Sequence, residues 1–125
     1  MIDRVAYRLE IVTEVRDWLH DLRRTDRASA ILVGQAVTAL LEEGPSLGRP
    51  LVDRIKNSNL HNLKELRPGS TGATEIRILF VFDPARNAVL LVAGDKAGQW
   101  TTWYRQSIPL AEARYAIYRK EKEES

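Results

Sequence analysis

Residues 74–93, TEIRILFVFDPARNAVLLVA, decide the fold of this chain. In the first part, 74–82, large apolar residues occupy every second position and so share one face: Ile76, Ile78, Phe80 and Phe82. The polar turn 83–87 follows, and then 88–93 is an uninterrupted apolar run, which is typical of a strand in the middle of a sheet. The stretch therefore predicts a β-hairpin at the centre of the protein.

Before this hairpin the sequence predicts a short strand and two helices. Alternating apolar residues over 7–12 indicate the strand, and apolar residues at helical spacing over 15–22 indicate an amphipathic helix. A second helix over 28–41, capped by Thr25 or Asp26, is apolar on most of its circumference. Such a helix needs cover on more than one side, either from a helical hairpin packed on a sheet or from a partner chain.

Around the hairpin we expect one more strand and one more helix. Residues 60–67 form a strand candidate, while 51–59 carry mixed signals that favour no element. A closing amphipathic helix is expected over 108–118, and the charged tail 120–125 is expected to fray. The order predicts an α+β domain in which an N-terminal strand and a two-helix hairpin pack on an antiparallel sheet of about four strands, with the helices segregated on one face and a C-terminal helix.

Length and composition narrow the classes of protein. A chain of 125 residues makes one domain, 1–125, and its 19 Lys and Arg against 17 Asp and Glu are weak evidence for a nucleic-acid partner. Cysteine is absent, and His20 and His61 are the two histidines, so we expect neither a metal nor a cofactor. The start of the chain lacks the apolar segment of a signal peptide, and the longest uncharged run is too short to span a bilayer. We therefore expect a cytoplasmic protein without membrane contact.

Cations on the predicted strands form the candidate site. They are Lys64 and Arg67 on one strand, Arg77 on its neighbour, and Lys96 just after the next. Arg77 is the most informative, because it lies between Ile76 and Ile78 in a strand that is otherwise apolar. A guanidinium in that position must meet a carboxylate or open onto a concave, wet surface.

The expected register of the strands predicts which charged residues share a face of the sheet. If both turns are symmetric, Leu63 pairs with Arg77 and Arg77 pairs with Ala93, so one face carries Glu65, Arg67, Glu75, Arg77 and Asp95. Two interpretations stay open. The charges could form an ion-pair lattice that only stabilises the sheet, or two arginines could bind a phosphodiester while acids such as Glu65 orient them.

Aromatic residues crowd into the segment 94–104, GDKAGQWTTWY. Trp100, Trp103 and Tyr104 lie close to Lys96 in the sequence. Single-stranded RNA is often bound this way, because bases stack on aromatic rings while phosphates pair with cations. We therefore interpret Lys64, Trp100 and Trp103 as RNA-binding candidates. The alternative is that the two tryptophans fold back into the core.

Several segments together resemble one family of toxins. They are LKELR at 63–67, EIRILF at 75–80, LLVAGDK at 90–96, the Trp103–Tyr104 pair, and IPLA at 108–111. As a set, covering about residues 5–120, the chain resembles the RelE/ParE superfamily and, within it, the HigB-like, phage-derived branch of type II toxin–antitoxin systems. The resemblance implies the RelE-like fold, with two N-terminal helices over an antiparallel sheet and a helix at the C-terminal end.

The resemblance also implies an activity and its partners. Such toxins are mRNA interferases, endoribonucleases that cut on the ribosome and inhibit growth, and a helix-turn-helix (HigA-like) antitoxin silences them in a hetero-oligomer. The ribose 2′-hydroxyl attacks the neighbouring phosphate without a metal. By this resemblance, Arg77 matches the family's arginine that neutralises the phosphate. Arg67 or Lys64 matches the basic residues of the preceding strand, and Lys96 matches the basic position after the last strand. Tyr104 matches the C-terminal aromatic or histidine that transfers a proton or stacks on a base.

This chain departs from the family pattern at two points. It has no histidine at the expected site, and the basic run after the last strand is reduced to Lys96. Acid–base work therefore falls to Tyr104, to Glu65, or to substrate positioning. Two other functions stay open: a ParE-like toxin that poisons DNA gyrase without nuclease chemistry, and an inactive relative that only binds its antitoxin.

Overall fold

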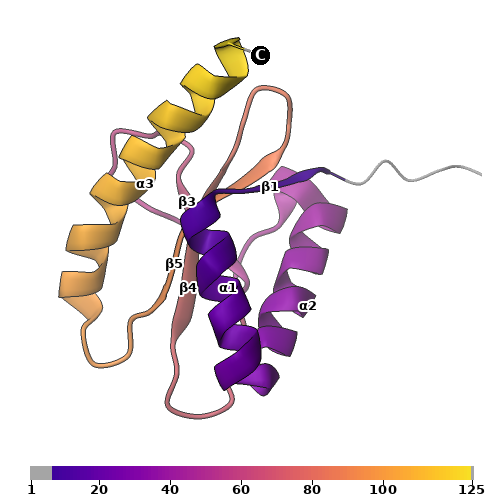
Figure 1. Cartoon of the computed structure of the whole chain (residues 1–125), viewed down its shortest axis with the longest axis vertical. Coiled ribbons are helices and arrows are strands. Elements are labelled where there is room, and N and C mark those ends of the chain that lie inside the picture. Colours follow the sequence, from indigo (N-terminus) through magenta and orange to yellow (C-terminus); the bar gives the residue numbers. More distant parts are fainter. Residues whose placement is uncertain (1–6, 125) are drawn as a thin grey trace, which may run out of the picture.

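Five strands form one sheet in the order β1-β5-β4-β3-β2, with helices on both faces (Figure 1). The computed structural model describes residues 7–124. In chain order the elements are β1 Leu9–Ile11, α1 Thr13–Thr25, α2 Arg27–Glu43, the 3-10 turn η1 Gly44–Ser46, β2 Val52–Arg54, β3 Lys64–Leu66, β4 Ile76–Phe82, β5 Ala88–Asp95 and α3 Trp100–Glu124. β1 runs parallel to β5, and the other neighbours are antiparallel. The α+β prediction is confirmed, with one more strand than expected.

The predicted hairpin is present as β4 and β5, but its register changes along its length. Near the turn Phe82 pairs with Ala88, as a symmetric turn requires. A bulge between Leu79 and Phe80 then shifts the pairing by one residue, so Arg77 lies opposite Gly94 and not opposite Ala93. The same shift corrects the predicted place of Asp95, which lies opposite Ile76 and so on the other face from Arg77.

β3 also pairs in a different register from the one expected. Leu66 lies opposite Ile78 and Glu65 opposite Leu79, whereas a symmetric turn would have paired Leu63 with Arg77. The displacement is an even number of residues, and side chains alternate with a period of two. The prediction that Glu65 and Arg77 share a face is therefore confirmed although the pairing itself was wrong.

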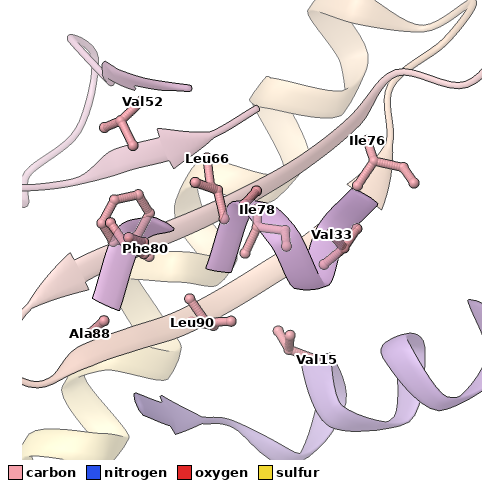
Figure 2. Close-up of a cluster of buried hydrophobic side chains, with 11 residues drawn as sticks. Val15, Val33, Val52, Leu66, Ile76, Ile78, Phe80, Ala88 and Leu90 are labelled. Atoms are coloured by element: carbon pink, nitrogen blue, oxygen red, sulfur yellow. The ribbon is translucent and has the colours of Figure 1, made fainter. Parts of the chain in front are cut away.

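Helices α1 and α2 cover one face of the sheet, as the helical-hairpin interpretation requires. Figure 2 shows Val15 of α1 and Val33 of α2 over the strand side chains Ile78, Phe80 and Leu90, all of them buried. Each fully buried aliphatic side chain in such a layer contributes about 1.5–3 kcal/mol. α2 begins where predicted, because the Asp26 carboxylate accepts hydrogen bonds from the backbone N–H and the hydroxyl of Ser29.

Helix α3 covers the opposite face, whereas we expected the helices on one face only. Trp103 and Ala111 pack there on Leu79, Val81 and Leu91, the strand residues that point away from α1 and α2. Because both faces of β4 and β5 are apolar, both need cover. α3 starts well before the expected 108–118 and continues to Glu124, through most of the tail that we expected to fray. Among residues 7–124, every helix is too short or too polar to span a bilayer.

Candidate functional site

A buried carboxylate, that of Glu65 on β3, holds the candidate site together. Its side chain is 3% exposed, and it accepts a hydrogen bond of 3.0 Å from Nη2 of Arg67 and one of 2.6 Å from the hydroxyl of Tyr104. Nε of Arg77 lies 3.7 Å from the same carboxylate. We call Glu65, Arg67, Arg77 and Tyr104 the Glu65 cluster. It joins β3, β4 and α3, which are far apart in the sequence.

Arg67 is the more exposed cation of the Glu65 cluster. Its side chain is 34% exposed, and Nη2 also contacts Oδ2 of Asp53 at 3.1 Å. Burial works against its charge, but the hydrogen bond and charge of Glu65 outweigh it and raise the pKa of Arg67. Asp53 stays ionised as well, because its hydrogen bond with Arg49 lowers its pKa. Arg67 is therefore a permanent cation with a surface that a ligand can reach.

Arg77 is more enclosed and less completely paired. Its side chain is 15% exposed, and Nη1 donates a hydrogen bond of 2.8 Å to the carbonyl of Ile76. Nε is buried and has no hydrogen-bond partner among the described residues. The carboxylates of Glu65 and Glu75 lie 3.7 and 3.9 Å away, beyond hydrogen-bond distance. Charge attraction thus holds Arg77 near the cluster without using its full donor capacity.

Lys96 lies beside the Glu65 cluster under an aromatic cover. Its ammonium is 3.2 Å from the centre of the Trp100 ring and 3.9 Å from Glu75, and the residue is only 2% exposed. Burial, together with the charge of Arg77, lowers its pKa. Trp100 itself is 54% exposed. The lysine therefore adds positive charge to the site, while the indole separates it from solvent.

An open groove of about 790 Å³ adjoins the Glu65 cluster. It runs between residues 54–59 and α3, and Glu65 and Tyr104 belong to its lining. Glu112 of α3 accepts hydrogen bonds of 2.7 Å from the hydroxyl of Ser58 and from the backbone N–H of Asn59, which holds the loop in place. This groove could not be predicted from the sequence, because residues 51–59 carry no periodic signal.

Most of the predicted site residues come together. Those in or beside the Glu65 cluster are Glu65, Arg67, Arg77, Lys96, Trp100 and Tyr104. Lys64 does not join them. It pairs with Phe80 on the face that α1 and α2 cover, and its ammonium donates to the carbonyl of Pro45 at 3.2 Å. Adjacent strand residues point to opposite faces, so Lys64 and Glu65 cannot share one site.

Trp103 corrects the prediction that both tryptophans are stacking surfaces. It is buried in the core and lies against Gly94, where a Cβ atom would come within 2.5 Å of its Nε1. The core alternative is therefore right for Trp103 and wrong for the exposed Trp100. The charges agree in part with both predicted arrangements, the ion-pair lattice and the phosphodiester-binding arginines. Ion pairs link the arginines to Glu65, while Arg67 stays accessible. Residues 7–124 contain no group of three His, Cys, Asp or Glu side chains that could hold a metal ion.

Comparison with known proteins places the chain in a family. The family described as phage-derived protein Gp49-like (DUF891) matches residues 17–116. "Putative toxin HigB2" of Mycobacterium tuberculosis H37Rv is 51% identical over 105 residues, which are 84% of this chain and 51% of that protein. "Putative toxin HigB3" of the same strain is 50% identical over 104 residues, 83% of this chain and 86% of that protein. The chain thus spans about half the length of the first relative and most of the second, and no solved structure matches it significantly. These matches confirm the resemblance to the phage-derived HigB-like branch, and the chain belongs to the Gp49-like family.

Proposed function

We propose that this protein is the toxin of a type II toxin–antitoxin system and that it cleaves mRNA on the ribosome without a metal. Two observations support this proposal, namely the names of the relatives and the geometry of the Glu65 cluster. Relatives at about half identity are named as HigB toxins. The observation that carries the chemistry is the Glu65 cluster, in which Arg67, directly after β3, and Arg77 of β4 reach one carboxylate beside an open groove.

The arginines supply charge stabilisation for the phosphate. When a ribose 2′-hydroxyl attacks the adjacent phosphorus, it loses its proton to water and a bond from its oxygen to phosphorus forms. The bond from phosphorus to the 5′-oxygen breaks, and the leaving 5′-oxygen takes a proton from water. In between, negative charge builds up on the phosphoryl oxygens. Guanidinium groups bind such oxygens as paired donors. Each 1.36 kcal/mol of stabilisation gives about a tenfold rate increase, so Arg67, Arg77 and the charge of Lys96 must act together.

Tyr104 and Glu65 take the remaining roles. Burial and the hydrogen bond to Glu65 raise the pKa of Tyr104, so the phenol keeps its proton at physiological pH and acts as a hydrogen-bond donor, not as a base. Glu65 orients both arginines and this hydroxyl through its two oxygens. We assign to it the task of positioning these donors around the phosphate.

The partner in this proposal is a helix-turn-helix (HigA-like) antitoxin. In the toxin–antitoxin complex we expect it to shield the surface of α2 or the cationic face of the sheet. The exposed Ile31 on α2 and the exposed part of Arg67 mark these two surfaces. Hydrogen exchange that stays the same in both regions on complex formation would contradict this part of the proposal.

Primer extension on mRNA in a translating extract tests the nuclease. The wild-type protein should produce codon-phased cuts, and Arg77→Ala should weaken them by about 100-fold, as removal of one transition-state donor does elsewhere. Arg24→Ala is the matched control, because Arg24 is exposed on α1 and, within residues 7–124, forms its one ion pair with Asp21 at 2.9 Å. Melting curves check that Arg77→Ala stays folded. Growth arrest with broken DNA and uncut mRNA would reject the nuclease in favour of a ParE-like gyrase poison.

A further inference from the structure

We propose that the groove between residues 54–59 and α3 binds the nucleobase next to the cleaved linkage. This inference rests on the proposed function and adds to it a site that selects the RNA sequence. The groove and the Glu65 cluster are continuous, because Glu65 and Tyr104 line both. A phosphate bound by Arg67 and Arg77 therefore has the groove directly beside it.

The lining of the groove matches the chemistry of a base. Apolar surface comes from Ile55, Ile108 and Pro109, and hydrogen-bonding groups come from Asn57, Asn59 and Thr101. A nucleobase needs apolar contact for its flat faces and donors or acceptors for its edges. Its volume of about 790 Å³ lies within the range of sites that hold small ligands, about 300–1,000 Å³.

The charges of the groove favour a nucleotide. Arg54, Lys56 and Arg105 line it, and none of the three forms an ion pair with another described residue. Its two carboxylates are already occupied: Glu65 by the Glu65 cluster and Glu112 by the loop. The charge left for a ligand is therefore positive, which suits the phosphates that flank a base.

The wall of the groove is held in place before any ligand arrives. Glu112 accepts from both Ser58 and Asn59, and the hydroxyl of Ser58 in turn accepts a hydrogen bond of 3.0 Å from the backbone N–H of Leu60. A loop that is tied to a helix in this way loses little conformational freedom on binding. This ordering separates the groove from an incidental hollow between mobile side chains.

The test compares inorganic phosphate with nucleoside 3′- and 5′-monophosphates as probes, read as amide shifts in NMR spectra of the full chain. Phosphate should shift amides near Glu65, Arg67 and Arg77 more strongly than any amide of the groove. At least one nucleotide should also shift amides of 54–59 and 104–112 and bind about fivefold or more tightly than phosphate, because of base stacking. Equal affinities with identical shift patterns would overturn the base site and leave the phosphate site standing. No binding of either probe would overturn the base site together with the cationic site of the proposed function.

A matched pair of variants tests the position of the site. Thr101 lines the groove, whereas its neighbour Thr102 is also exposed in the first turn of α3 but lies outside the lining. Thr101→Tyr should remove the advantage of the nucleotide over phosphate, because the ring fills the space of the base, while phosphate affinity stays the same. Thr102→Tyr should change neither. Equal nucleotide binding by wild type and Thr101→Tyr would contradict the inference.

Discussion

The hydroxyl of Tyr104 donates a hydrogen bond of 2.6 Å to Glu65, which lies 39 residues earlier in the chain. This bond ties the helix that covers one face of the sheet to the carboxylate between Arg67 and Arg77. The placement of α3 and the arrangement of the cations are therefore coupled. A change at either residue should affect both the stability of the fold and the geometry of the site.

Glu65→Gln tests whether this carboxylate holds the arginines. The amide keeps the shape and can still accept from Tyr104, but it loses the attraction to two guanidinium groups. We expect a loss of about 2 kcal/mol in the free energy of unfolding, measured with urea. Glu14→Gln is the control, because the Glu14 side chain is 57% exposed and its ion pair with Arg114, at 3.5 Å, should contribute under about 1 kcal/mol. Equal losses for the two variants would show that Glu65 is not a structural anchor.

Tyr104→Phe should change how stability depends on alkaline pH. Burial and the bond to Glu65 raise the pKa of Tyr104 in the folded protein above its ordinary value of 10.0. The folded state therefore keeps this proton more tightly, and stability that is fully present below about pH 10 is lost as the pH rises further. We expect the wild type to lose more stability than Tyr104→Phe above this pH. Because the pKa of Tyr118 is raised in the same direction by burial and by Asp83, the comparison is made in a Tyr118→Phe background, where parallel curves would disprove the effect.

Lys96 should react slowly with an amine-acetylating reagent. Its ammonium is buried beneath Trp100, whereas Lys56 and Lys120 are exposed. Mass spectrometry of partly labelled protein should show Lys96 modified at least about tenfold more slowly than those two, since reaction requires local opening. Trp100→Ala should remove most of this protection. If Lys96 is labelled as fast as the exposed lysines in the wild type, the indole does not cover it in solution.

Gly94→Ala should destabilise the protein through Trp103. A Cβ atom at position 94 would lie 2.5 Å from the indole Nε1, so the ring must leave its place in the core. We expect a loss of about 1–3 kcal/mol in the free energy of unfolding and a shift of tryptophan fluorescence. Gly34→Ala, in the middle of α2 with open space around it, should instead stabilise by about 0.5–1 kcal/mol. A Gly94→Ala protein as stable as the wild type would contradict this packing.

The local elements and the cationic residues could be predicted because their signals lie in neighbouring residues. The alternation in 74–82 and the apolar run 88–93 predicted β4 and β5. Thr25 or Asp26 was predicted to cap α2, and Asp26 is the residue that does so. β2 could not be predicted, since three residues carry no pattern and their strand exists through pairing with β3. The groove beside it was missed for the same reason.

By itself the sequence determined most of the strands and helices, with β2 and the start of α3 as exceptions. It also determined that Glu65, Arg67 and Arg77 share a face, because side-chain alternation is local and survives an even shift of register. Only the tertiary structure decided which strand residues lie opposite each other and which side chains α3 buries. The bulge at Leu79 and Phe80 placed Arg77 opposite Gly94, and the packing of α3 sent Trp103 into the core while Trp100 stayed over Lys96. Such pairings depend on contacts between segments that are far apart in the sequence. The free energies of these contacts cannot be inferred from a short stretch of neighbouring residues.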